Sequence, residues 1–200
     1  MKNMGSKIIE TDRLILKPQT MNEQKYLWSV LMIPSVNKYY LSVPVKFREK
    51  LKDWNKQEQF YIEEMKHSND LDIYRWSIFL KNGECIGRIS CQEAEFDSDS
   101  EIDPAIRDVG WYIDPRYQGN GYCTEAAQAM LKYMFEEVGI TEIKTGAAIE
   151  NPASWKIMER LGFKRLSYTK MIQYTYLDEL TEDYQYNITK EMYFDKIDND

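Results

Sequence analysis

Histidine is almost absent from this chain of 200 residues, in which His67 is the only one. Mechanisms and metal sites that need two imidazoles are therefore excluded. The three cysteines, Cys85, Cys91 and Cys123, form neither a CxxC pair nor a zinc-like spacing, so we expect reduced thiols in a cytoplasmic protein and no bound metal. If the chain is an enzyme, then carboxylates, hydroxyls and backbone amides carry most of its chemistry.

Long apolar runs and an excess of positive charge are missing as well. No apolar stretch approaches the roughly 18 residues that a membrane helix needs, and the N-terminus lacks the apolar core of a signal peptide. The formal net charge is −7, so the chain as a whole repels phosphate backbones. We therefore expect neither a membrane nor a nucleic acid as the primary partner.

Nothing in the sequence divides the chain into parts. It contains no internal repeat, low-complexity tract or Pro/Gly-rich linker, and its length suits one domain of roughly 100–200 residues. We expect a single domain over residues 1–200, with a core at about residues 11–195, that exists as a monomer or a homodimer.

Hydrophobic periodicity predicts an alternation of strands and helices. The Asn82-Gly83 dipeptide indicates a tight hairpin turn, and Asn151 before Pro152 indicates a capped helix start. The expected strands cover residues 13–18, 73–80, 85–90, 106–113, 142–149, a stretch from 163 onward, and 184–194. The expected helices lie in pieces between residues 22 and 65, along an apolar stripe over 126–138 ended by Gly139, and over 152–161. This order predicts an α/β (α+β) fold with a mixed, mostly antiparallel sheet of six to seven strands flanked by helices.

The most informative segment is a glycine loop between a strand and a helix. The strand ends at Ile113, Gly119 and Gly121 let the backbone turn, and a helix follows at once. Free N–H groups and the positive end of the helix therefore converge, which favours a bound phosphate. Arg116 adds a positive charge, and the Thr124 hydroxyl lies in the first helical turn.

Two standard phosphate motifs do not fit this loop. A dinucleotide fingerprint needs a third glycine where Thr124 stands, and the Gly-Lys-Ser/Thr of a P-loop is absent. The remaining pattern, Arg-x-x-Gly-x-Gly at residues 116–121, resembles the pyrophosphate-binding motif of the GNAT superfamily of acetyl-CoA-dependent N-acetyltransferases. Residues 108–113 resemble that family's fourth strand, and residues 151–163 resemble its second cofactor motif. The Thr-x-Arg-Leu-x-Leu at residues 11–16 is similar to the opening of the RimJ/RimL branch, the ribosomal-protein-alanine N-acetyltransferases.

The resemblance implies a sheet whose central strands, ending at Ile113 and Ile149, splay apart around acetyl-CoA. It also implies that a backbone N–H near Ile113 meets the developing oxyanion. The residues that would bind the cofactor are Ile113, Arg116, Gln118, Gly119, Asn120, Gly121, Tyr122, Thr124, Asn151 and Ser154.

The proton transfers have several candidate residues. Asp108 is our first choice for the general base, followed by Glu93 and Glu150. Many family members place a tyrosine acid where this chain has Met158, which has no proton to donate. The late proton would then come from water or from Ser154, whose hydroxyl has an equal claim to be a helix cap.

The acceptor is the least determined feature. An α-amine is more often neutral at pH 7 than a lysine amine, which favours a protein N-terminus. The alternatives are a small amine such as a polyamine, an amino sugar or an antibiotic, or a non-catalytic acyl-CoA-binding module. Six aromatic residues either line an acceptor groove or pack in the core: Tyr39, Tyr40, Trp54, Phe60, Tyr61 and Trp76.

Overall fold

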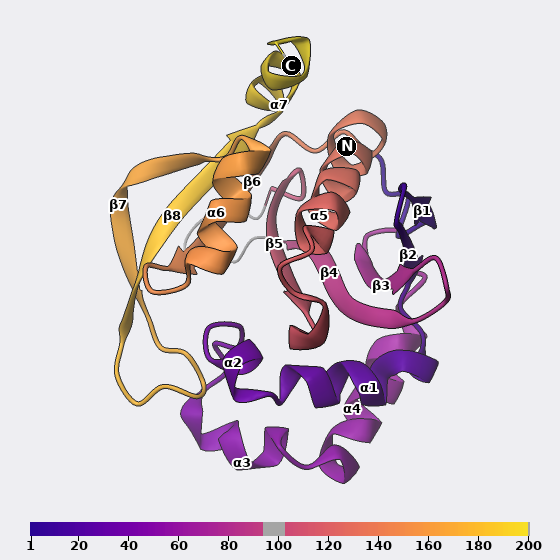
Figure 1. The fold of residues 1–200 in the computed structure, drawn as a ribbon, viewed down its shortest axis with the longest axis vertical. Coiled ribbons are helices and arrows are strands. Elements are labelled where there is room, and N and C mark those ends of the chain that lie inside the picture. The colour runs from indigo at the N-terminus through magenta and orange to yellow at the C-terminus, as the bar shows by residue number, and fades with distance from the viewer. Residues whose placement is uncertain (94–102, 200) are drawn as a thin grey trace.

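An eight-stranded sheet runs through the molecule in the order β1-β2-β3-β4-β5-β6-β8-β7 (Figure 1). The computed structural model describes residues 1–93 and 103–199. Neighbouring strands are antiparallel except β5 and β6, which are parallel. The predicted mixed, mostly antiparallel fold is confirmed, although the sheet has one strand more than the six to seven expected. The additional strand β1 is only two residues long, too short to give an alternating pattern.

The strands are β1 (Ile9–Glu10), β2 (Leu14–Pro18), β3 (Arg75–Leu80), β4 (Cys85–Glu93), β5 (Ile106–Ile113), β6 (Glu142–Ala148), β7 (Lys164–Ile172) and β8 (Thr181–Thr189). The helices are α1 (Met21–Leu31), α2 (Pro34–Asn37), η1 (Val45–Phe47), α3 (Arg48–Leu51), α4 (Trp54–Lys66), η2 (Pro115–Tyr117), α5 (Tyr122–Lys132), the π-helical η3 (Tyr133–Val138), α6 (Pro152–Leu161) and α7 (Lys190–Asn199). Each helix in the described part of the chain is too short or too polar to cross a bilayer.

Two local signals in the sequence gave the correct geometry. Gly83 has φ +89°, and the Asn82 side chain accepts a hydrogen bond from the Glu84 amide at 3.1 Å, so the β3–β4 hairpin turns where predicted. Gly139 has φ +75° and ends the helical stretch begun by α5. That stretch changes from α to π geometry at Tyr133, which the apolar periodicity did not indicate.

The predicted strand over residues 184–194 is wrong beyond Thr189, where α7 begins. The Thr189 hydroxyl accepts a hydrogen bond from the Met192 amide at 3.3 Å, which satisfies a donor of the first helical turn. Tyr193 then stacks on Phe135 at 4.8 Å, and its hydroxyl donates a hydrogen bond to Glu136. These tertiary contacts, absent from any local pattern, stabilise helix over strand in this segment.

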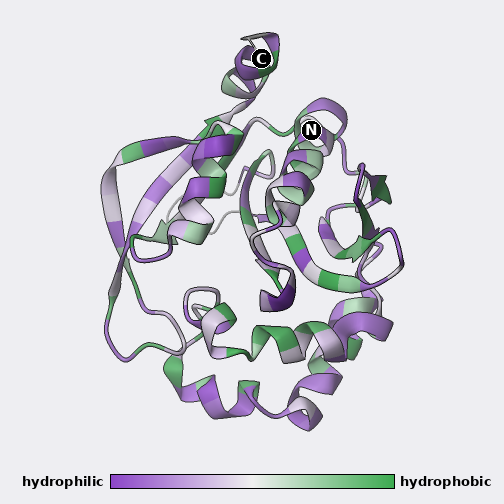
Figure 2. Cartoon of the chain, viewed as in Figure 1, coloured by the Kyte–Doolittle hydropathy of each residue, from purple (hydrophilic) through white to green (hydrophobic). Residues whose placement is uncertain are grey.

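The two faces of the sheet are covered by different helices. The larger core lies between the sheet and α5 and α6, and includes Ile89, Ala126 and Met130, all 0% exposed. A smaller cluster packs α1 and α2 against Tyr112 of β5. The outer helices α3 and α4 are mostly hydrophilic, whereas β4 carries apolar segments along its length (Figure 2). The cofactor helix predicted from the glycine loop, α5, is therefore buried on the face opposite α1.

The middle of the sheet opens into a wedge between β5 and β6. These strands pair only at Ile106 with Glu142 and at Arg107 with Ile143. On the outer sides, β4 follows β5 from Arg107 to Ile113, and β8 follows β6 along its whole length. The two halves of the sheet thus separate beyond Arg107, and the predicted splaying of the central strands is confirmed (Figure 1).

Candidate functional site

The glycine loop has the backbone geometry that its sequence predicts. Gly119 and Gly121 have φ +79° and +77°, a left-handed conformation that strains other residues. Gly121 is the N-cap of α5, and the first bond of this helix runs from the Glu125 amide to the Gly121 carbonyl at 3.0 Å. The amides of the first turn, from Tyr122 to Thr124, therefore have no partner within the helix.

The amides of the loop itself are also open. Among the described residues, no acceptor is found for the N–H groups of Gly119, Asn120 or Gly121. A Cβ placed on Gly119 would meet nothing within 4 Å, so the loop borders open space. A row of unsatisfied donors at the positive end of a helix is what a phosphate group requires, and the loop therefore fits the diphosphate of coenzyme A.

Side chains around the loop hold its shape. Arg13 donates to the Asn120 carbonyl at 2.9 Å, pairs with Glu125 at 2.6 Å and lies over the Tyr122 ring at 4.7 Å. The Asn120 side chain donates back into the loop, to two carbonyls, at 3.1 Å. Sequence reasoning missed this role of Arg13, although the motif that contains it had been noted for its resemblance to the family.

The side chain of Gln118 also helps to hold the glycine loop in place. Its side-chain amide donates to the carbonyl of Ile113 at 2.9 Å, which ties the loop to the end of β5. The side chains of Gln118 and Asn120, both predicted to bind the cofactor, thus have protein acceptors, and the backbone amides form the open donor set.

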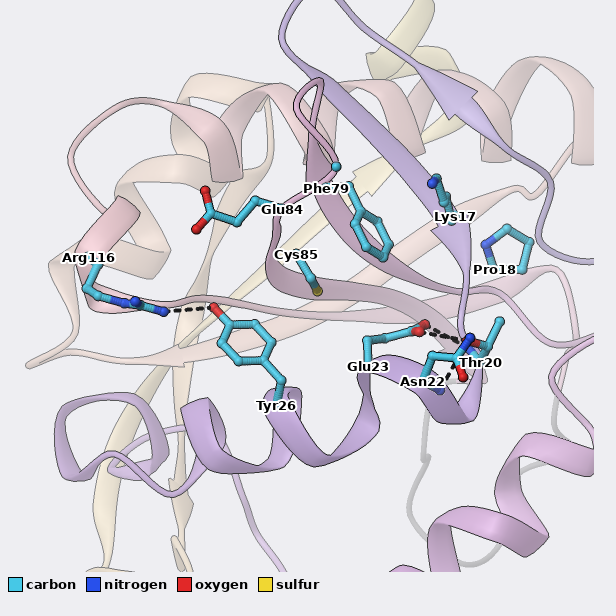
Figure 3. Close-up of a pocket in the computed structure, with 11 residues that line it drawn as sticks. Lys17, Pro18, Thr20, Asn22, Glu23, Tyr26, Phe79, Glu84, Cys85 and Arg116 are labelled. Carbon is cyan, nitrogen blue, oxygen red and sulfur yellow. Dashed lines mark hydrogen bonds between the residues drawn. The ribbon is translucent and has the colours of Figure 1, made fainter.

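Arg116 lies outside this row of amides. Its guanidinium pairs with Asp114 at 2.8 Å, and Asp114 also accepts from the Tyr26 hydroxyl at 2.8 Å. The hydrogen bond from Arg116 lowers the pKa of the Asp114 carboxyl, which is 3% exposed. Figure 3 shows Arg116 and Tyr26 at one end of a pocket of about 610 Å³ that extends to Lys17 and Phe79. The charge of Arg116 is largely offset by Asp114.

Backbone amides of β5 face into the wedge. The Asp114 amide donates to Ile86 of β4 at 2.8 Å, and alternate residues of a strand direct their N–H groups to opposite edges. The amide of Ile113, and two residues earlier that of Trp111, therefore face the side of β6, where the strands no longer pair.

Asp108 lies at the vertex of the wedge, immediately after the last residue of β5 that pairs with β6. Its carboxylate accepts a hydrogen bond from the Val109 amide at 2.7 Å. Five residues of extended strand, roughly 17 Å, separate Asp108 from Ile113. The structure therefore does not bring these two predicted catalytic groups to one reacting atom.

The helix α6 lies on the same face of the sheet as α5, because the two helices contact each other and share one core. Asn151 is the N-cap and Pro152 the first helical residue, as predicted, but the Asn151 side chain forms no capping bond, which corrects the expectation of a strong cap. The Ser154 hydroxyl takes part in no hydrogen bond found among the described residues, so it does not act as a helix cap either.

The other candidate groups are spread over the molecule. Met158 is 2% exposed and belongs to the core. Glu150 accepts from the Tyr39 hydroxyl at 2.7 Å, and Glu93 is at the exposed end of β4. Burial raises the pKa of the Cys123 thiol to about 12, which makes it a poor nucleophile.

The six aromatic residues divide between core and surface. Trp76 is fully buried and Phe60 is 56% exposed, while Tyr39, Tyr40, Trp54 and Tyr61 are partly exposed beside the sheet. The sequence did not distinguish the buried aromatic residues from the exposed ones, because both kinds occur at the spacing of a helix or a strand.

Comparison with known proteins gives a family match over most of the chain. The model of the acetyltransferase (GNAT) domain matches residues 13–164. The uncharacterized protein YkkB of Bacillus subtilis is 25% identical over 86% of this chain and 91% of its own length. The uncharacterized N-acetyltransferase YnaD of the same organism is 38% identical, but the match covers 32% of this chain and only 37% of that relative.

Solved structures share the fold. A GNAT-family acetyltransferase from Bacillus anthracis superposes with a TM-score of 0.71 at 23% identity, over 92% of this chain and 99% of that one. The spermidine N-acetyltransferase of Vibrio cholerae, in complex with CoA and spermine, gives 0.72 at 17% identity, over 92% and 99%. The ribosomal-protein-S5-alanine acetyltransferase of Vibrio fischeri gives 0.71 at 14%, over 92% and 97%. At these identities the likeness establishes the fold and leaves the acceptor open.

Proposed function

Because this chain belongs to the GNAT acetyltransferase family, we propose that it transfers an acetyl group from acetyl-CoA to the N-terminal α-amine of a protein. The observation that carries the proposal is the set of open amides from Gly119 to Thr124 at the mouth of the β5–β6 wedge. When bound, acetyl-CoA supplies a diphosphate for this loop and an acetyl thioester for the wedge.

The residues that hold the cofactor divide into donors and supports. The amides of Gly119, Asn120, Gly121, Tyr122 and Thr124 would bind the diphosphate, with the Thr124 hydroxyl beside them. Asn151 and Ser154, at the start of α6, would contact the cofactor from the other side of the wedge. Arg13, Gln118 and the Asn120 side chain keep the loop in place, and Arg116 contributes a positive charge nearby.

Two backbone amides and one carboxylate on β5 would act on the acyl transfer. The Ile113 amide lies at the mouth of the wedge, next to the glycine loop, and the Trp111 amide lies about 7 Å deeper. Fixed amides facing the wedge stabilise negative charge on the thioester oxygen without reorganising. Asp108 at the vertex would accept the proton of the amine only through a chain of water molecules, because it lies roughly 10 Å along the strand from Trp111, farther than one bridging water spans.

The chemistry of the amine favours an N-terminus over a lysine. At pH 7 an α-amine of pKa about 8 is roughly 10% neutral, whereas a lysine amine of pKa about 10.4 is about 0.04% neutral. This difference corresponds to about 3.3 kcal/mol. An α-amine therefore places a smaller demand on a site whose base acts at a distance.

A second candidate acceptor is a small cationic amine. A pocket of about 540 Å³ beside the loop that joins β7 and β8 is lined by four carboxylates and one lysine: Glu150, Asp178, Glu179, Glu182 and Lys38. This charge would attract a polyamine. The spermidine N-acetyltransferase with the same fold has spermine bound, in agreement with such a substrate in a related fold.

Release of the CoA thiol from acetyl-CoA, measured with a panel of peptides and small amines, tests the proposal. Turnover of peptides with a free N-terminus, together with no turnover of the same peptides after N-terminal blocking, is the expected result. Turnover of polyamines alone would favour the second candidate. Binding of acetyl-CoA with no turnover of any amine would identify a non-catalytic acyl-CoA-binding protein and overturn the proposal.

A further inference from the structure

Arg88, in the middle of β4, carries a positive charge that the protein does not pair. Its guanidinium forms no hydrogen bond, ion pair or ring contact among the described residues, and its Nε is buried without a partner. The side chain is only partly exposed. Interior charges are normally paired, because removing an ion from water costs several kcal/mol. The absence of a protein partner here therefore needs an explanation.

The surroundings of Arg88 consist of three tyrosines and one carboxylate that is already paired. Its electrostatic neighbours are Tyr40, Tyr61 and Tyr112, followed by Glu64. Glu64 is already in an ion pair with Arg75, so its charge is offset. The hydroxyls of Tyr40 and Tyr61 form no hydrogen bond within the described part of the chain, whereas that of Tyr112 donates to the Leu27 carbonyl. Three groups with free donors, Arg88, Tyr40 and Tyr61, thus lie within electrostatic reach of one another.

This group lies on the sheet face away from α5 and α6. Ile89 and Cys91 are 0% exposed in the core on the α5 side. Successive side chains of a strand point to opposite faces, so Arg88, next to Ile89, lies on the face that α1 covers. Arg88 is the cross-strand partner of Tyr112, whose two neighbours on β5 present their amides to the wedge. Tyr40 packs edge-on against Tyr112 at 4.9 Å, so Arg88 and Tyr40 lie beside β5 on the face opposite α5, from which an acceptor would approach.

Gly110 of β5 lies in contact distance of Tyr40 and Ser90 on this face. A Cβ placed on Gly110 of β5 would lie 3.5 Å from the Tyr40 hydroxyl and 3.6 Å from the Ser90 hydroxyl. Because Gly110 has no side chain, both hydroxyls lie close to the backbone of β5, the strand that borders the wedge.

We propose that Arg88, with the hydroxyls of Tyr40 and Tyr61, binds a carboxylate that the acceptor carries close to the amine to be acetylated. A carboxylate accepts two bonds from a guanidinium and would compensate the charge. The proposal rests on the proposed function and specifies its substrate class: a protein whose N-terminus is acidic. Adjacent strands lie about 4.8 Å apart and an extended peptide advances about 3.3 Å per residue, which places the acidic side chain within the first three residues.

Peptide pairs that differ only as Asp or Asn at position one, two or three test this selectivity without catalysis. Each is titrated by calorimetry into the protein saturated with CoA, which cannot transfer an acetyl group. At one position the Asp peptide should bind at least about ten-fold more tightly than the Asn peptide, the range of a charge-assisted bidentate pair. The ratio should fall below about two-fold in Arg88→Met, be partly kept in Arg88→Lys, and be unchanged in Arg165→Gln, which removes an exposed guanidinium on β7.

A structural role for Arg88 gives a different result. If Arg88 holds the fold together, Arg88→Met should lower Tm and leave the Asp/Asn ratio unchanged; if it binds a ligand, Tm should stay the same or rise, because an unpaired charge is removed. Equal binding of Asp and Asn peptides at all three positions, or no peptide binding, overturns the proposal. Selective binding without acetyl transfer would overturn the proposed function and keep this inference, and transfer without selectivity would do the reverse.

Discussion

A substitution at Gly119 can show whether the loop's amides bind acetyl-CoA, because the effect of backbone strain can be measured separately. Its φ is +79°, and a Cβ there meets nothing within 4 Å, so a substituent is strained but does not clash. In Gly119→Asp a carboxylate would occupy the space in front of the open amides. We expect affinity for acetyl-CoA to fall by about 10- to 100-fold, since one charge-assisted hydrogen bond worth about 1.5–3 kcal/mol is lost. Titration calorimetry measures this loss.

Gly139→Asp is the matched control. Gly139 has φ +75° and also has nothing within 4 Å of a Cβ, so the substitution adds the same strain and the same charge at the end of η3. Its affinity for acetyl-CoA should stay within about two-fold of wild type, well under 1 kcal/mol. An equal loss in both variants would mean that backbone strain, and not the loop's amides, controls binding.

Asp183 on β8 carries a buried carboxylate with one unsatisfied oxygen. It is 3% exposed, its Oδ2 accepts from the Tyr174 hydroxyl at 2.6 Å, and its Oδ1 has no partner among the described residues. Burial raises the pKa of this carboxyl to about 6. The unfolded value is about 3.9, so the native state binds the proton more tightly and the free energy of unfolding falls as the pH rises from about 4 to 6.

Asp183→Asn should therefore be more stable than wild type at pH 7. The shift corresponds to at most about 3 kcal/mol, or an increase in Tm of several degrees for a chain of this size. Near pH 4 the two proteins should melt at nearly the same temperature. Thermal unfolding followed by circular dichroism at both pH values measures this difference. Asp178→Asn, at a side chain 89% exposed, should leave Tm unchanged, and a lower Tm for Asp183→Asn at pH 7 would contradict the argument.

At the scale of elements, Asp114 joins the end of β5 to η2 and α1. Its buried carboxylate accepts from the Arg116 amide at 2.9 Å, from the Arg116 guanidinium and from the Tyr26 hydroxyl. Asp114→Ala should lower the free energy of unfolding by about 2–4 kcal/mol, because buried donors lose their acceptor. Tyr26→Phe removes one of these bonds and should cost about 1 kcal/mol. Urea denaturation at pH 7 measures both.

The stabilisation that Asp114 provides should depend on pH in one direction. The hydrogen bond from Arg116 lowers the pKa of Asp114 below that of the unfolded chain. The stabilisation is therefore complete above about pH 4 and is lost as the pH falls through the native pKa. The difference between wild type and Asp114→Ala should shrink under strongly acidic conditions. A difference that stays constant down to pH 2 would show that Asp114 acts by packing alone.

Elements with local signals were predictable from the sequence. The glycine loop, the Asn82-Gly83 turn and the Gly139 helix end depend on backbone conformations that neighbouring residues determine. By contrast, α7 forms because Tyr193 packs on Phe135, far away in the sequence, and β1 is too short to show periodicity. Local patterns cannot report such contacts.

The candidate site shows the same division. The open amides follow from a strand, two glycines and a helix in succession, which the sequence displays. The hydrogen bond from Arg13 to the Asn120 carbonyl joins residues that are 107 positions apart in the sequence. The guanidinium of Arg88 is known to be unpaired only because the structure shows which groups lie around it. Charge counts show how many acids and bases are present, but only the folded structure shows which of them lack a partner.

At the scale of the whole molecule, the sheet consists of two halves joined in its middle by two residue pairs of β5 and β6. Beyond Arg107 the Thr145 hydroxyl of β6 donates to the Val109 carbonyl at 3.4 Å, and the amides of Trp111 and Ile113 have no partner across the wedge among the described residues. A ligand that fills the wedge would therefore connect the halves where the protein does not. Acetyl-CoA at 100 times its Kd should stabilise the fold by about 2.7 kcal/mol, which for 200 residues raises Tm by roughly 5–10 °C.

Hydrogen exchange locates that stabilisation. On addition of acetyl-CoA, amides from Val109 to Ile113 and along β6 should exchange more slowly, because local opening of the wedge then requires release of the ligand. The β2–β3 ladder, on the far side of β4, should be protected only to the extent that global stability rises. Gly119→Asp should lose both the rise in Tm and the local protection. A rise in Tm without slower exchange in β5 and β6 would place the ligand outside the wedge, in the pocket beside Arg116 or elsewhere on the surface.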